Sequence, residues 1–96
     1  MTDAEKLAML KLALDMRHAD AQREAQLEQL LTVAASRIAQ RGITLRDDLS
    51  DTQLQVDLAA WLFRRRNQTA GPAMPESLRH DLNDRLVAES GVSADG

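Results

Sequence analysis

The sequence contains no cysteine, which excludes disulfide bonds and thiolate metal ligands and fits a reducing compartment. It has no tyrosine, and its only aromatic residues are Trp61 and Phe63. No apolar run approaches the ~20 residues that a membrane-spanning helix needs, and the start, MTDAEKLAMLKLAL, does not read as a secretory signal. The four glycines are scattered, so there is no glycine-rich phosphate loop. These absences argue against disulfide scaffolds, membrane proteins and phosphate-loop enzymes.

Basic groups are in the minority: 12 lysine and arginine residues stand against 15 aspartate and glutamate residues, a formal net charge of −3. Proteins that bind the phosphate backbone of nucleic acid usually carry a basic excess or a strongly basic face. The balance therefore argues against nucleic acid as the main partner. Only Lys6 and Lys11 are lysines, and the preference for arginine fits either protein interfaces, where its planar group pairs with carboxylates, or the codon usage of a GC-rich genome.

The 96 residues are enough for one small domain, which we place at residues 1–90, followed by a mobile tail at residues 91–96. No segment alternates apolar and polar residues long enough to indicate a strand. Four segments have helical periodicity, at about residues 3–16, 20–41, 50–67 and 75–90. The sequence thus predicts an all-α fold, a small bundle of four helices. Expected end signals are Thr2 or Asp3, Gly42, and Ser50 with Gln53 in capping-box spacing.

The third helix is apolar almost all round, with a narrow polar strip of Gln53, Asp57 and Arg64, which is typical of the central helix of a bundle. In the connection before it, Ile43, Leu45 and Leu49 are expected to point inward. The fourth helix carries a leucine stripe at intervals of four residues for docking on one surface. The core anchors predicted from these patterns are Leu31, Ile38, Leu58, Trp61, Leu62, Phe63 and Leu82.

The first helix has two apolar stripes on different sides of its cylinder. One runs through Leu7, Leu10 and Leu14, and the other contains Met9, Leu12 and Met16. Such a short helix needs cover on more than one side, and one cover can be a neighbouring molecule. The candidate residues for a subunit or partner interface are Met9, Leu12, Met16 and Arg23.

Three consecutive arginines, Arg64, Arg65 and Arg66, follow the aromatic residues of the third helix. Because successive helical side chains diverge by ~100°, the three cannot form a single patch. One interpretation is that they stabilise the helix end and pair with Glu76, Asp81 or Asp84 of the next helix. The other is that they contact DNA or an acidic partner.

No catalytic constellation is apparent, and we expect neither an enzyme nor a cofactor or metal site. His18 and His80 lack metal-ligand spacing, and Asp47 with Asp48 is more simply a turn before a helix. A helix-turn-helix reader is disfavoured because the acidic residues of the fourth helix would repel phosphate.

The residues do resemble one family. The segments LAMLKLAL (residues 7–14), LEQLLTVAASRIAQRGI (residues 27–43) and QLQVDLAAWLFRRRNQTAGPAMPESLRHDLNDRLVAE (residues 53–89) resemble the small head–tail connector proteins of tailed bacteriophages and prophages, also called adaptor or head-completion proteins. The resemblance covers nearly the whole chain, and its second half is the more specific part.

The resemblance implies an all-helical subunit that assembles as a homo-oligomeric ring, commonly of twelve copies, in the virion neck. The implied partners are the portal protein above it, a downstream neck or tail protein below it, and DNA that passes non-specifically through its channel. It implies assembly in the host cytoplasm and no membrane partner. An alternative that the residues leave open is a small helical regulator that binds DNA or another protein.

Overall fold

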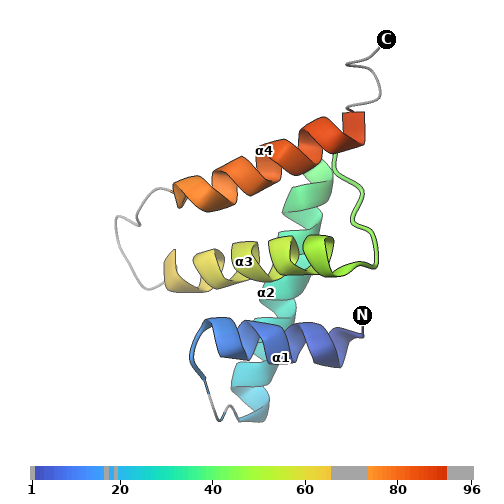
Figure 1. The fold of residues 1–96 in the computed structure, drawn as a ribbon. Coiled ribbons are helices and arrows are strands. Elements are labelled where there is room, and N and C mark those ends of the chain that lie inside the picture. The colour runs from blue at the N-terminus through green and yellow to red at the C-terminus, as the bar shows by residue number, and fades with distance from the viewer. Residues whose placement is uncertain (1, 17, 19, 66–73, 91–96) are drawn as a thin grey trace.

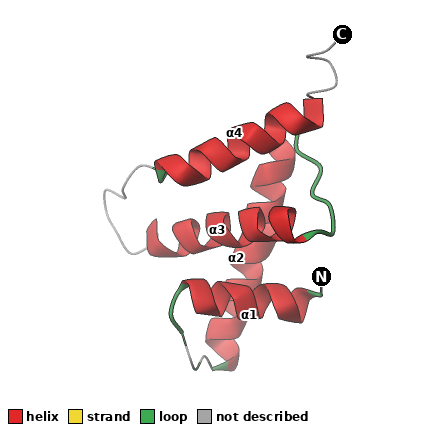
Figure 2. Cartoon of the chain, in the orientation of Figure 1, coloured by secondary structure: helices red, strands yellow, loops and turns green. Residues whose placement is uncertain are grey.

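The computed structural model describes residues 2–16, 18, 20–65 and 74–90. Within these residues the chain forms four helices and no strand (Figure 2), which confirms the predicted all-α bundle. The helices are α1 (Asp3–Ala13), α2 (Ala21–Gln40), α3 (Leu49–Arg65) and α4 (Glu76–Ser90). The tail expected to be mobile, at residues 91–96, lies outside the described residues, as does Arg66.

The helix α3 packs against each of the other three helices. Figure 1 shows α1, α3 and α4 crossing in front of α2, with α3 between α1 and α4. The buried face of α3 is not purely apolar, because Asp51, Thr52 and Gln55 are buried beside its leucines, valine and alanines. Gln55 Nε2 donates to the Leu31 carbonyl of α2 at 2.8 Å, which satisfies a polar group that is costly to bury alone.

The hydrophobic core lies where α2 crosses α1 and α3. Its largest fully buried side chains include Leu10 of α1, Leu27 and Ile38 of α2, Leu58 of α3 and Leu82 of α4. Of the core anchors named from the sequence, Leu31, Ile38, Leu58 and Leu82 are buried. The other three, Trp61, Leu62 and Phe63, are partly buried and pack against the core from the C-terminal part of α3.

The helix ends follow local capping chemistry. Thr2 and Glu5 form a reciprocal capping box at α1, and the Asp20 side chain accepts the Arg23 amide at α2. Each of these capping bonds satisfies an amide that has no partner inside its helix. At its other end, α1 stops three residues earlier than expected because Asp15 adopts a left-handed φ of 57°.

The expected cap of α3 at Ser50 was wrong. Asp48 Oδ1 accepts the Asp51 amide at 2.8 Å, and Ser50 is already helical. The shift has a physical reason, since a carboxylate is a strong amide acceptor and favours the positive end of the helix dipole. The helix therefore begins earlier, and Leu49 is 62% exposed rather than turned inward, whereas Ile43 is buried and Leu45 partly buried.

The chain leaves α2 through Gly42, whose φ is 95°, as predicted for a left-handed helix end. Gly42→Ala is expected to lower the free energy of unfolding by about 1–2 kcal/mol, because a side chain is strained in this region. The added Cβ would lie 3.7 Å from Leu86 Cδ1, an ordinary contact, so the loss would come from the backbone. Urea unfolding measures it, with the exposed neighbour Arg41→Ala as control. An unchanged unfolding midpoint would contradict the strain argument.

Candidate functional site

An ion pair ties α4 to the start of α3. Arg85 Nε donates to Asp51 Oδ1 at 2.8 Å, and the two side chains are only 10% and 3% exposed. Arg85 Nη2 also donates to the Thr44 carbonyl at 2.6 Å, and the Thr44 amide donates to Glu89 Oε1 at 2.6 Å. The Arg46 amide donates to Asp51 Oδ2 at 2.7 Å. We call this network of Arg85, Asp51, Glu89 and the Thr44 and Arg46 backbone the Arg85 clamp. It joins α3, α4 and the connection between α2 and α3.

The clamp sets the protonation of its own members. Burial would raise the pKa of Asp51, but hydrogen bonds from Arg85 and the Arg46 amide outweigh it and lower that pKa below its usual value. The Thr44 amide lowers the pKa of Glu89, and the bond from Arg85 to Asp51 raises the pKa of the guanidinium. All three groups are therefore charged at neutral pH. The clamp therefore joins its three segments through charged groups.

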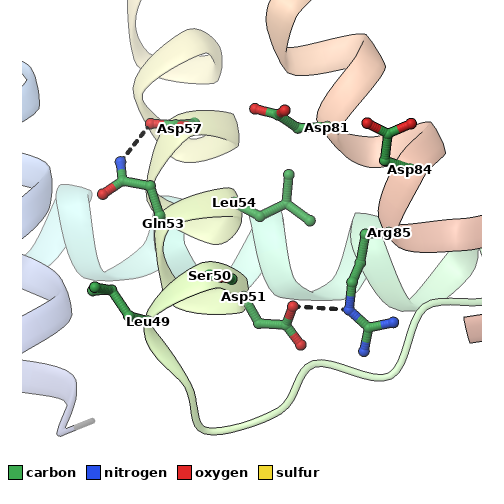
Figure 3. A pocket seen from close by; sticks show the side chains of 9 residues that line it. All are labelled: Leu49, Ser50, Asp51, Gln53, Leu54, Asp57, Asp81, Asp84 and Arg85. Carbon is green, nitrogen blue, oxygen red and sulfur yellow. Dashed lines mark hydrogen bonds and ion pairs between the residues drawn. The ribbon is translucent and has the colours of Figure 1, made fainter. Parts of the chain in front are cut away.

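A groove runs between α3 and α4 beside the clamp, with a volume of ≈ 560 Å³. Figure 3 shows Leu54 between the two helices, Asp81 and Asp84 on the α4 side, and Arg85 turned away from them toward Asp51. Four aspartates and one arginine line the groove, a formal charge of −3. The lining residues are Leu49, Ser50, Asp51, Gln53, Leu54, Asp57, Asp81, Asp84 and Arg85. We call this groove the acidic groove.

The arginines at the end of α3 do not form the ion pairs expected of them. Among the described residues, neither Arg64 nor Arg65 pairs with Glu76 or with the two aspartates of α4. Instead, Arg64 Nη2 donates to the Ala13 carbonyl at 2.8 Å, and the Arg65 guanidinium lies 5.1 Å from the Trp61 ring centroid. The Ala13 carbonyl is available as an acceptor, since the last carbonyls of a helix lack internal partners. Arg64 thus links the C-terminal ends of α1 and α3.

The interface candidates of α1 separate into two groups. Met9 and Met16 are partly buried against the core, while Leu12 is 81% exposed. Leu12 shares its exposed face with Ala4 and Ala8, which precede it at intervals of four residues. An apolar strip on α1 therefore remains uncovered by the described part of the chain.

Arg23, the fourth interface candidate, lies in the first turn of α2. Its guanidinium is 5.5 Å from the Phe63 ring centroid, and its Nη1 donates to Gln26 Oε1 at 3.2 Å. The nearby Lys11–Glu24 ion pair joins α1 to α2. Arg23 therefore lies on the same end of the bundle as the C-terminal ends of α1 and α3.

The two histidines lie at the surface of the described bundle. His18 is exposed, and His80 is exposed with Nε2 3.8 Å from Glu76 Oε1. The described ranges contain no group of three or more histidine, aspartate or glutamate side chains arranged to hold a metal ion. In the same ranges, no helix has the length and apolar character needed to cross a bilayer.

Comparisons with protein-family models, with curated proteins and with solved structures found no match to this chain.

Sequence reasoning missed the Arg85 clamp, although a signal was present. Arg85 lies three residues after Leu82, and Glu89 lies seven residues after Leu82, so both lie on the face of the leucine stripe. On α3, Asp51 lies four residues before Gln55 and seven before Leu58, on the buried face. Two charges on facing buried stripes indicate a buried ion pair.

Proposed function

We propose that this chain is a structural subunit of an oligomeric ring, the head–tail connector of a tailed bacteriophage or prophage. In this proposal the ring lies beneath the portal, extends the DNA channel and docks the next neck or tail component. The resemblance over residues 7–89 supports the family, and the four-helix fold is compatible with it. The connector function is therefore one of assembly and not of catalysis.

The observation that carries the proposal is the exposure of Leu12. A leucine that is 81% exposed beside Ala4 and Ala8 leaves an apolar strip in water on a helix whose other apolar side chains pack against the core. Burying a leucine side chain contributes about 1.5–3 kcal/mol. A ring repeats this contribution at every contact between subunits, so modest contacts suffice for a stable assembly. Single exposed leucines are common, and the strip around Leu12 is what distinguishes this one.

The net charge of −3 suits a channel through which DNA passes, because a strongly basic lining would bind the phosphates and hold them. Arg64 and Arg65 are already engaged with the Ala13 carbonyl and the Trp61 ring. Their proposed role is to order the end of the bundle that faces a partner, with DNA contacts secondary to it.

Electron microscopy of concentrated protein tests the proposal, with closed rings as the expected result. Leu12→Asp is expected to abolish the rings, while its circular dichroism and melting temperature match those of wild-type protein diluted until it is monomeric, because the side chain has little contact to lose within the subunit. Val87→Asp is the matched control, since Val87 is a second large apolar residue, 60% exposed on α4. A wild-type protein that stays monomeric at every concentration contradicts the ring. Loss of helicity in Leu12→Asp would instead place Leu12 in the subunit's own core.

A further inference from the structure

The acidic groove between α3 and α4 is open at its rim and apolar at its floor. The exposed lining residues are Leu49, Ser50, Gln53, Asp81 and Asp84. Leu54, which is 5% exposed, lies between the two helices (Figure 3). Along α3 the lining extends from Leu49 to Asp57, about 12 Å at ~1.5 Å per residue, or roughly two turns. So open a site suits a segment of a macromolecule, because small-molecule sites bury most of their ligand.

Two carboxylates on the α4 wall have no cation. Within the described ranges, no ion pair involves the side chain of Asp81 or Asp84. These residues are three apart, so their side chains are neighbours on one face of α4. Arg85, the one cation that lines the groove, is already bonded to Asp51 and to the Thr44 carbonyl. The wall therefore offers two adjacent negative charges to a partner.

The charge is not uniform along the groove. Arg64 lines a neighbouring pocket together with Asp57 and Asp81, although its guanidinium is bonded to the end of α1. Asp84 lies outside that pocket, so its charge is the least offset. The opposite wall carries exposed apolar surface at Leu49, which is 62% exposed. The groove thus combines an anionic wall with an apolar one.

This combination restricts what the groove can bind. Nucleic acid is disfavoured, because the lining of four aspartates and one arginine repels phosphate. The carboxylates of these described residues are not arranged in a group that could hold a metal ion, and a metal ion would leave Leu49 in water. An apolar side chain with cations beside it satisfies both walls. A protein segment with leucine and arginine or lysine has that chemistry.

We propose that the acidic groove docks a short helical segment of another protein, with an apolar side chain against Leu49 and Leu54 and cationic side chains against Asp81 and Asp84. This inference deepens the docking role in the proposed function, on which it rests for the partner's place in the neck. The apolar contact contributes affinity, and the charges contribute specificity. Leu12 lies on α1, which does not line the groove, so docking and the contact between subunits use different surfaces.

Binding of a synthetic peptide tests the docking site. The probe is a fluorescein-labelled, alanine-rich helical peptide of about 15 residues, with one leucine and with arginines one turn before and after it. Fluorescence anisotropy measures its dissociation constant. Asp81→Asn with Asp84→Asn, the groove variant, is expected to weaken binding about 5–10-fold, because it removes two exposed ion pairs. Leu49→Ala is expected to weaken it about 3–10-fold, because it removes apolar contact.

Matched controls separate the groove from net charge. Glu28→Gln with Glu76→Gln removes the same charge from exposed positions outside the groove, and is expected to change the affinity by no more than about twofold at physiological salt. Two control peptides, with glutamine for the arginines or alanine for the leucine, are each expected to bind more weakly than the probe. Circular dichroism and the melting temperature check that every variant is folded.

The outcomes distinguish this docking site from the proposed ring. No saturable binding of the probe at up to about 1 mM wild-type protein overturns the docking site, and so does an equal loss of affinity in the groove and control variants. In electron microscopy the folded groove variant is expected to form rings like the wild type. Loss of its rings would assign the groove to a second copy of the chain and overturn the separate partner. Groove-dependent binding by a protein that never forms rings supports the docking site and overturns the ring alone.

Discussion

Arg85→Met is expected to lower the free energy of unfolding by about 3–5 kcal/mol, since it leaves Asp51 buried without its cation. Asp51 is 3% exposed and cannot recover the lost bond from water. Small domains are stable by only about 5–15 kcal/mol, so this loss is a large part of the total. Methionine keeps most of the apolar stem of arginine, so the change reports the charge rather than a cavity. Urea unfolding at pH 7 measures the loss.

Two controls make this measurement specific. Arg79→Met removes an exposed arginine from the same helix and is expected to change the free energy of unfolding by no more than about 0.5 kcal/mol. A double-mutant cycle with Asp51→Asn isolates the energy of the pair itself. Equal small losses in Arg85→Met and Arg79→Met would show that the clamp does not hold α4.

The loss in Arg85→Met is also expected to depend on pH. In the wild type the lowered pKa values of Asp51 and Glu89 contribute stability that is complete above the unfolded-state pKa of ~4 and is lost as the pH falls through the lower folded values. In the variant, burial without the cation raises the pKa of Asp51 above its unfolded value, so protonation relieves the penalty as the pH falls. The difference between the two proteins should therefore shrink between pH 7 and pH 3. A constant difference would mean that Arg85 acts through packing alone.

The sequence predicted the helices and much of the core because both depend on short-range periodicity. Leu31 and Ile38 share a face of α2 at a spacing of seven residues, and Leu78 and Leu82 share one of α4, whichever partner covers them. Gly42 was predictable for the same reason, since the end of a helix has local chemistry.

The remaining features depend on partners distant in sequence. Arg85 and Asp51 are 34 residues apart, and the spacing within either helix cannot show that the two faces meet. The partial burial of Trp61 depends on where α3 ends relative to its neighbours, and periodicity does not report it. Its indole Nε1 is buried with no hydrogen-bond partner in the described part of the chain, which is unusual because a buried indole N–H usually finds an acceptor. Leu49 is exposed because a cap two residues earlier than expected moved the start of α3.

The interface candidates show the same limit. The two stripes of α1 indicated excess apolar surface, and Leu12 is exposed while Met9 and Met16 pack against the core. Helical spacing alone predicts the same exposure for these three residues, since all belong to one stripe. Burial distinguishes them because it depends on how far α1 is rotated toward α2 and α3.

Leu10→Ala is expected to lower the free energy of unfolding by about 2–5 kcal/mol, because Leu10 is fully buried and its loss leaves a cavity between α1 and its neighbours. In a domain of this size, about 1 kcal/mol corresponds to roughly 4–8 °C in Tm. Leu12→Ala, only two residues away, is expected to change the free energy of unfolding by no more than about 0.5 kcal/mol. Differential scanning calorimetry of the two variants, at a dilution at which the wild type is monomeric, measures the contrast.

The same pair separates folding from assembly. Below its melting temperature Leu10→Ala keeps the exposed strip of α1 and should still form rings, whereas Leu12→Ala removes the apolar side chain and should weaken them. Leu10→Ala should therefore affect folding and Leu12→Ala assembly, because the two side chains lie about 200° apart around α1. Equal losses of stability in both variants would mean that Leu12 is covered within the subunit. The argument for an uncovered apolar strip, and with it the contact between copies, would then fail.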